Sequence, residues 1–94
     1  MSAHGESMRC DVWLFRARLY KSRGLAGQMI EKGAVRIDRN GQVTRLTKPA
    51  APVRPGDCLV IRRDADPMRL TVLALPERRG PAPEAQSCYS LETE

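Results

Sequence analysis

The sequence predicts an α+β domain in which a pair of helices packs against a small, twisted, mainly antiparallel β-sheet. Apolar residues repeat with a helical period in the first third of the chain, and the period changes to two after Gly33. The length of 94 residues allows one small domain and no second catalytic unit. We divide the chain into a disordered N-terminus (1–8), a folded domain (9–75) and a flexible C-terminal tail (76–94).

The first helix is expected from about Arg9 to Tyr20. One buried stripe follows the i, i+3, i+4, i+7 spacing of a helix face: Cys10, Trp13, Leu14 and Ala17. A second apolar strip runs along the other side: Val12, Phe15 and Leu19. Either the C-terminal part of the chain covers this second strip, which is the interpretation we prefer, or the strip contacts RNA bases or protein.

The second helix is expected from about Ser22 to Lys32, with Ser22 as its N-cap and Gly33 as a left-handed C-cap. Its apolar stripe is formed by Leu25, Ala26, Met29 and Ile30. Gly24 and Gly27 each cost such a helix about 1 kcal/mol relative to Ala. Packing must therefore hold the helix, or the glycines permit close approach of a neighbour; the sequence leaves both explanations open.

A hairpin follows, because Val35 and Ile37 alternate with polar residues and Asn40-Gly41 is a strong tight-turn signal before Gln42 to Thr44. A loop with three prolines comes next, and its turn Pro55-Gly56-Asp57 leads into a strand. This loop covers Lys48 to Asp57. The remaining expected elements are a strand over Cys58 to Ile61, a polar turn over Arg63 to Pro67 and a strand over Leu70 to Leu75. From Pro76 onward, prolines and scattered acids predict a tail that docks loosely or is disordered.

Positive charge is concentrated in the first half of the chain. Ten of the sixteen Lys and Arg residues lie between Arg9 and Lys48, where only three acidic residues occur. Charge clustered on one helix-rich segment is typical of a nucleic-acid-binding surface. The competing interpretation is a solvated basic helix face, because charged runs commonly serve only solubility.

The charged residues of this segment are of the types that bind phosphate. Arg offers a planar fork for bidentate contacts, Lys adds a point charge, and a helix that begins at Ser22 directs backbone amides toward an anion. The helices, their connecting turn and the hairpin could together line a positive groove with these side chains: Arg16, Arg18, Lys21, Arg23, Arg36, Arg39 and Lys48.

Other chemistries find little support in the sequence. The cysteines Cys10, Cys58 and Cys88 form no CxxC pair and His4 is the sole histidine, so we expect neither a disulfide framework nor a metal site. We find no glycine-rich cofactor loop, catalytic triad or carboxylate pair, and therefore expect no enzyme activity, no cofactor and no small-molecule substrate. We interpret the following acids as structural or turn residues: Asp11, Asp57 and Asp64.

No stretch resembles a signal peptide, because Met1 to Ser7 is small and polar, and no run approaches the roughly 20 apolar residues of a membrane span. We therefore expect a cytoplasmic protein without a membrane partner. A monomer is the simplest expectation for a binder with a single site.

The same segment carries an ordered series of short motifs: Arg9-Cys10-Asp11-Val12-Trp13-Leu14-Phe15, Arg18, Lys21-Ser22-Arg23, Ala26, Ile30, Gly33, Val35, Asn40-Gly41, Lys48-Pro49 and Gly56-Asp57. This series resembles the S4 family of RNA-binding domains, named after a protein of the small ribosomal subunit, over about Arg9 to Ile61. Within that family the chain is most similar to small bacterial heat-shock proteins that associate with ribosomes. That similarity extends through Leu70 to Leu75, Glu77-Arg78-Arg79 and Pro83-Glu84-Ala85.

The resemblance implies an αα-turn on a small twisted sheet (the alpha-L RNA-binding motif) whose helices and hairpin contact structured RNA. It further implies binding to free large ribosomal subunits that carry a nascent chain on tRNA, in rescue or recycling during stress. The RNA-facing positions that it implies are Arg9, Arg16, Arg18, Lys21, Ser22, Arg23, Gln28, Lys32, Asn40 and Lys48. Arg36 is added to this set on its charge alone.

Two alternatives remain at this stage. This type of module is often fused to RNA-modifying enzymes, so the chain could be the detached RNA-binding arm of such an enzyme. It could also be a protein-interaction or chaperone module that uses Val12, Phe15 and Leu19. Binding that survives nuclease treatment would favour the protein-interaction module.

Overall fold

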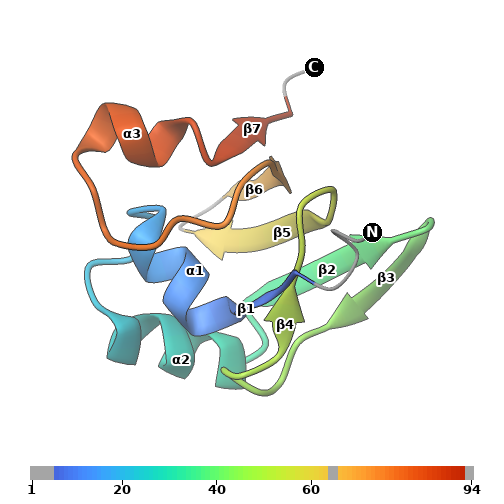
Figure 1. The fold of residues 1–94 in the computed structure, drawn as a ribbon. Coiled ribbons are helices and arrows are strands. Elements are labelled where there is room, and N and C mark those ends of the chain that lie inside the picture. The colour runs from blue at the N-terminus through green and yellow to red at the C-terminus, as the bar shows by residue number, and fades with distance from the viewer. Residues whose placement is uncertain (1–5, 64–65, 93–94) are drawn as a thin grey trace.

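The computed structural model describes residues 6–63 and 66–92. Three helices and seven strands follow one another in this part of the chain (Figure 1). In chain order they are β1 (Met8–Arg9), α1 (Cys10–Arg16), α2 (Arg23–Glu31), β2 (Val35–Arg39), β3 (Gln42–Arg45), β4 (Pro52–Val53), β5 (Cys58–Arg63), β6 (Asp66–Val72), α3 (Ala82–Gln86) and β7 (Tyr89–Leu91).

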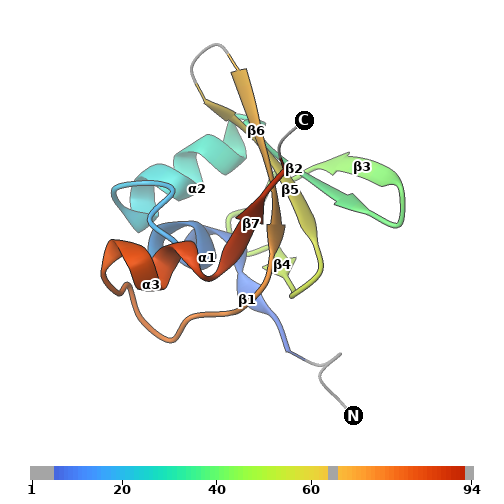
Figure 2. The same ribbon diagram turned by 90° about the horizontal axis from the view of Figure 1, so that it is seen from above.

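The strands form two antiparallel sheets. The larger has the strand order β3-β2-β5-β6-β7, and the smaller pairs β1 with β4. All three helices lie on one side of the larger sheet (Figure 2). The predicted α+β class with a mainly antiparallel sheet is confirmed.

The core lies between α1, α2 and the inner face of the larger sheet. Its largest fully buried side chains are Trp13, Leu14, Ile30, Leu59, Ile61, Leu70, Val35, Val53, Val72 and Cys10. The predicted stripe of the first helix is confirmed, because each of its residues is at most 1% exposed. In α2, Ala26 and Ile30 are fully buried, while Leu25 and Met29 are half-buried at the edge.

Helix α1 is shorter than expected and ends at Arg16 instead of Tyr20. The Arg18 N–H donates to the carbonyl of Phe15 (3.1 Å), and the Leu19 N–H donates to that of Leu14 (3.0 Å). Arg18 has a φ of +61°. These are the hydrogen bonds and the left-handed residue of a Schellman C-cap, which turns the chain toward α2.

Helix α2 begins and ends as predicted. The Ser22 hydroxyl accepts from the Leu25 N–H at 3.0 Å. At the other end Gly33 has a φ of +84°, and the Ala34 N–H donates to the carbonyl of Met29 at 3.0 Å. This is a second Schellman cap, here with the glycine that the left-handed conformation favours.

The two glycines of α2 differ in their surroundings. A Cβ atom on Gly27 would lie 3.4 Å from the Pro49 ring, whereas a Cβ atom on Gly24 would have no neighbour within 4 Å. Gly27 thus permits close approach of the loop that follows β3. Gly24 has no such packing reason.

The hairpin turn is confirmed, because Asn40 and Gly41 have φ values of +57° and +80° and connect β2 directly to β3. The predicted strand over Leu70 to Leu75 is displaced, since β6 runs from Asp66 to Val72. β5 extends to Arg63, which pairs with Asp66, so the polar turn is shorter than predicted.

The sequence also predicts no strand at the start of the chain or in the proline-rich loop. Met8 nevertheless pairs with Val53 in the small β1–β4 sheet, so the disordered N-terminus predicted over 1–8 does not include Met8. The rest of that prediction falls mainly on residues 1–5, which lie outside the described residues.

The C-terminal segment differs most from the predicted loose tail. It contains α3 and β7, and β7 completes the larger sheet by pairing Tyr89 with Val72. The Trp13 indole N–H donates to the Ala74 carbonyl at 2.9 Å, which fixes the start of this segment on α1. Main-chain pairing of this kind leaves no apolar periodicity in the sequence.

The C-terminal segment covers part of the second apolar strip of the first helix. The Arg79 guanidinium lies 4.8 Å from the Phe15 ring centre, and Leu19 is only 4% exposed. The preferred interpretation that the C-terminal part of the chain covers the strip is confirmed for Phe15, and Leu19 is buried in the core cluster.

Candidate nucleic-acid interface

Most of the predicted RNA-facing residues lie on β1, on the turn before α2, or on α2 and its C-cap. We call this set the helix surface: Arg9, Lys21, Ser22, Arg23, Gln28 and Lys32. All six side chains are exposed. Arg9, Arg23 and Gln28 line one shallow depression, whose other lining residues are Asp11, Gly24, Gly27, Glu31 and Pro49. Lys32 lies one helical turn beyond Gln28 on the same side of α2.

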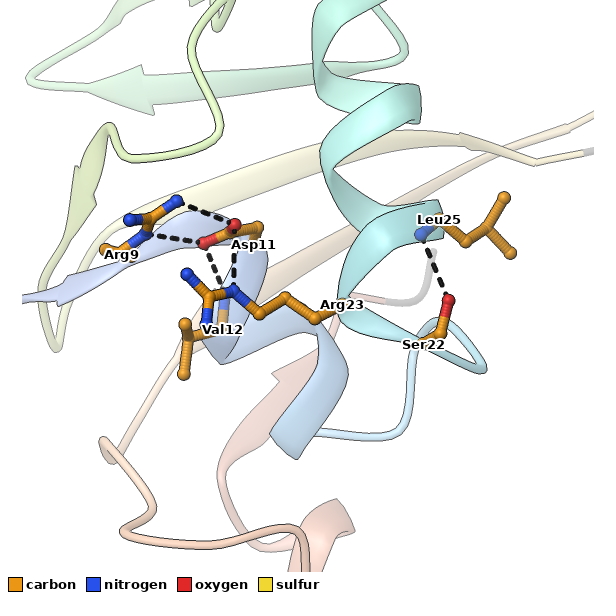
Figure 3. Close-up of polar contacts among 6 residues, drawn as sticks. All are labelled: Arg9, Asp11, Val12, Ser22, Arg23 and Leu25. Carbon is orange, nitrogen blue, oxygen red and sulfur yellow. Dashed lines mark hydrogen bonds and ion pairs between the residues drawn. The ribbon is translucent and has the colours of Figure 1, made fainter.

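A buried carboxylate organises one end of the helix surface. Asp11 is only 4% exposed and accepts two hydrogen bonds from Arg9, from Nε to Oδ1 and from Nη2 to Oδ2, both at 3.0 Å. Arg23 donates from Nε to Oδ2 at 3.3 Å, and the Val12 N–H donates to Oδ1 at 2.8 Å (Figure 3). One carboxylate thus aligns guanidinium groups from two separate elements.

The electrostatic balance keeps Asp11 ionised. Burial alone would raise the pKa of Asp11, but the hydrogen bonds from Arg9 and Arg23 and the positive charge of Arg9 lower it below its usual value. The same contacts raise the pKa of Arg9, mainly through its hydrogen bond to Asp11. Asp11 and Glu31 line the same depression as Arg9 and Arg23, so the charges of the depression balance. The excess positive charge of the helix surface is carried by Lys21 and Lys32.

Free donors remain for an anion. Arg23 uses only Nε in its contact with Asp11, so both of its terminal nitrogens are without a partner in the described part of the chain. The first amides of α2 also have no acceptor within the helix, apart from the Leu25 N–H that Ser22 caps. Guanidinium groups and amides at a helix start can both donate to phosphate oxygens.

The loop after β3 holds Lys48 close to this surface. The Cys10 and Asp11 N–H groups at the start of α1 donate to the carbonyls of Ala51 (2.8 Å) and Pro49 (3.1 Å). The loop therefore caps α1 in place of a side chain. The exposed Lys48 immediately precedes Pro49 and extends the positive charge beyond α2.

Arg16 and Arg18 form hydrogen bonds within the fold that the sequence does not reveal. Arg16 donates from Nη1 to the Pro76 carbonyl at 2.9 Å, and Arg18 donates from Nε to the Gly80 carbonyl at 2.6 Å. Both side chains thus hold the C-terminal segment against α1. Each guanidinium is thus partly occupied by this contact.

Arg36 and Asn40 lie apart from the helix surface. Arg36 projects from β2 between the buried Val35 and Ile37, so it faces the side of the sheet that is opposite to the helices. Asn40 is exposed at the tip of the β2–β3 hairpin. The eleven predicted residues therefore do not line one groove.

A second buried aspartate fixes the base of the hairpin. Arg39 donates from Nε and Nη2 to Asp57 at 3.0 and 2.7 Å, and the Arg54 N–H donates to the same carboxylate at 2.8 Å. Burial would raise the pKa of Asp57, but these contacts lower it. The structural interpretation of Asp11 and Asp57 is confirmed, while Asp64 lies outside the described residues.

Within residues 6–63 and 66–92, no group of three His, Cys, Asp or Glu side chains could hold a metal ion, and no helix is long and apolar enough to cross a membrane. The three cysteines are free thiols. Burial, aided by the nearby Asp11 charge, raises the pKa of Cys10 to about 12. This thiol therefore stays protonated inside the core.

Comparison with known proteins identifies the family. The model of the S4 domain family matches residues 8–58, a range that contains every residue of the helix surface. Heat shock protein 15 of Escherichia coli K12 is 42% identical over 82 residues, which make up 87% of this chain and 58% of that protein. The heat shock protein 15 homolog of Haemophilus influenzae is 38% identical over 89 residues, or 95% of this chain and 63% of that protein.

A solved structure agrees with these sequence matches. The trimeric structure of Vibrio cholerae Heat Shock Protein 15 matches with a TM-score of 0.80 and 36% identity, over 93% of this chain and 83% of that chain. The present chain spans less than two thirds of the length of the curated relatives from Escherichia and Haemophilus.

Proposed function

This chain belongs to the S4 domain family, and from that premise we propose that it is a noncatalytic RNA-binding protein that recognises structured ribosomal RNA. The observation that carries the proposal is the helix surface, where five cationic or amide side chains are exposed and two of them, Arg9 and Arg23, are aligned by one buried carboxylate beside α2. Because Asp11 is neutralised by its own arginines, it does not repel a phosphate.

Recognition would proceed by shape and charge. The terminal nitrogens of Arg23 and the amides at the start of α2 would bind one phosphate group, while Lys21 and Lys32 would contact neighbouring phosphates. Phosphate contacts of this kind fix the register and orientation of a protein on RNA without reading bases. Folded RNA, which presents phosphates in a fixed geometry, suits a rigid surface of this type.

The proposed partner is the large ribosomal subunit. The relatives named heat shock protein 15 support a role in the stress response, and we extend this to binding of free large subunits during rescue or recycling of stalled translation, in the cytoplasm. Contact with tRNA on such subunits is part of the same proposal. The detached arm of an RNA-modifying enzyme remains the alternative, and it would bind through the same helix surface.

Most of the apolar strip on which the protein-interaction alternative depends is not open to a partner. Leu19 is buried and Phe15 is covered by Arg79, so neither presents an open apolar patch. Only Val12 of that strip stays half-exposed without such a cover.

Sedimentation of cell lysate through a sucrose gradient tests the proposed partner. We expect enrichment on free large subunits, increased by stalling translation and lost in the double variant Lys21→Gln/Lys32→Gln. The matched control is Arg54→Gln/Arg78→Gln, which removes the same charge from exposed positions elsewhere. Migration only with small subunits or free tRNA would contradict the large-subunit proposal.

We also propose that a single copy suffices for binding, although the Vibrio cholerae relative is described as trimeric. Light scattering after size exclusion, at the protein concentration used for RNA binding, tests this directly. A mass near the 10.5 kDa of one chain supports the proposal. A mass of three chains would contradict it.

A further inference from the structure

The larger sheet has a face that no described helix covers (Figure 2). Side chains alternate along a strand, so the neighbours of the buried Val35, Ile37, Leu59 and Ile61 lie on the other side. Asp38, Cys58 and Arg69 lie on this side by the same register. We call the following part of it the open face: Ala34, Arg36, Arg45, Val60, Arg62 and Pro67. The side chains of Arg36, Arg45 and Arg62 are all exposed.

Among the side chains that the structure describes, the arginines of the open face have no ion-pair partner. Arg36 and Arg45 are direct cross-strand neighbours in the β2–β3 pair, and neither they nor Arg62 form an ion pair in the described part of the chain. Arg69 of the same sheet is neutralised by Asp38 and Glu92. Like charges directly opposite each other destabilise a sheet, so sheet stability does not explain this pair.

A hollow lies between two of these arginines. Its lining consists of the apolar residues Ala34, Val60 and Pro67 together with Arg36 and Arg62. Its volume is about 210 Å³. This is less than the roughly 300 Å³ at which small-molecule pockets begin. It suits one unit of a polymer, such as a single base or phosphate.

We propose that the open face binds single-stranded RNA, as a second contact separate from the helix surface. Adjacent strands lie about 5 Å apart, so Arg45, Arg36 and Arg62 form a short cationic track for successive phosphates. Arg guanidinium planes also stack on unpaired bases, and the apolar side chain of Val60 can contact the face of a base. The inference rests on the proposed function only in that the ligand class is again RNA.

Binding of a fluorescent eight-nucleotide oligouridine, followed by anisotropy, tests the proposal. We expect wild-type protein and the Lys21→Gln/Lys32→Gln variant to bind, and the Arg36→Gln/Arg62→Gln variant to bind more weakly. Loss of two single-strand phosphate contacts should reduce the slope of log affinity against log salt by about 1.4. The control Arg54→Gln/Arg78→Gln removes equal charge elsewhere and should retain the slope.

Chemical-shift mapping on the wild-type protein gives a readout that does not depend on the folding of any variant. Oligouridine should perturb the amides of Ala34, Arg36, Val60 and Arg62. Perturbation confined to α1 and α2, or equal binding by the open-face variant and the control, would overturn the proposal. Displacement by polyglutamate at matched charge concentration would also overturn it, because an acidic protein would then be the better partner.

The two proposals fail separately. A structured rRNA hairpin that binds the Lys21→Gln/Lys32→Gln variant as well as wild type would contradict the helix surface and leave the oligouridine result standing. Oligouridine binding that is insensitive to Arg36 and Arg62, with the hairpin still dependent on Lys21 and Lys32, would contradict only the open face.

Discussion

Asp11 is an acidic residue at one end of a basic surface, and its contacts explain its presence there. It aligns Arg9 and Arg23 through its two oxygens and accepts from the Val12 amide. Arg23 therefore has two roles, one structural and one proposed for RNA. Reversing its charge would place a second carboxylate beside Asp11, which is why the tests above use Lys21 and Lys32 instead.

Replacing Asp11 by Asn should lower the free energy of unfolding by about 1 to 2 kcal/mol at neutral pH, because charge-assisted hydrogen bonds are lost. Asn can still accept from the Val12 amide, so the start of α1 should keep its geometry. Urea unfolding of both proteins, followed by circular dichroism, measures the difference.

The pH dependence of this difference follows from the lowered pKa of Asp11. A carboxyl group with a lowered folded-state pKa stabilises the fold above its unfolded pKa of about 3.9. That contribution is lost as the pH falls through the lower, folded-state pKa. The stability difference should therefore be full at neutral pH and shrink at acidic pH, and a constant difference down to the acid limit would refute the ion-pair explanation.

At the scale of elements, the C-terminal ends of α1 and α2 show what the sequence can and cannot predict. Gly33 is predictable as a left-handed cap because glycine has no Cβ penalty there. Arg18 adopts the same conformation with a φ of +61° although its side chain disfavours it. Its contact with Gly80, 62 residues away, supports it, and no local pattern reveals such a contact.

Substituting Ala at the two glycines should have opposite effects. Gly33→Ala should destabilise the fold by about 1 to 2 kcal/mol, because φ is +84° and the new Cβ would lie 2.9 Å from Arg45 Cδ. Gly24→Ala should stabilise it by up to about 1 kcal/mol, since the position is helical with no neighbour within 4 Å. Chemical denaturation measures both, and equal signs would contradict the assigned backbone roles.

The C-terminal segment escaped prediction for a related reason. Helix α3 has only five residues and includes a proline, and β7 has three residues that pair through their main chain. Neither is long enough to show a period. β7 is held by its pairing with β6 and by the contact of Tyr89 with Trp13 of α1, whose ring centres lie 6.3 Å apart.

Arg79→Ala should therefore cost more than Arg78→Ala. Arg79 stacks 4.8 Å from the Phe15 ring centre and donates to the Phe15 carbonyl at 3.0 Å, contacts worth about 1 to 2 kcal/mol together. In the described part of the chain, the ion pair of Arg78 is with the exposed Glu84. Exposed ion pairs of this kind contribute little to stability. Thermal unfolding of the two variants compares them, and equal losses would mean that Arg79 does not hold the segment.

For the whole molecule, the sequence predicts which segment carries the positive charge but not which faces present it. Arg23 and Gln28 lie on the predicted second helix and Lys32 at its C-cap, so one local element holds all three. The side occupied by Arg36 depends on the register between β2 and β5 and on the position of the helices. The hydrogen bonds of Arg16 and Arg18 depend on the C-terminal segment, for which the sequence predicts no regular structure.

The distribution of charge over the molecule predicts that the salt dependence of RNA affinity distinguishes the helix surface from the open face. A structured RNA that reaches only the helix surface, with about four to six phosphate contacts, should give a slope of about −4 to −5 for log affinity against log salt. Lys21→Gln/Lys32→Gln should reduce the magnitude of this slope by about two, since each Lys accounts for about one phosphate. Arg36→Gln/Arg62→Gln should leave it unchanged for this RNA, although it removes the same charge from a protein of net charge +5. Equal reductions by both variants would mean that the RNA responds to the overall charge of the protein and not to a defined surface.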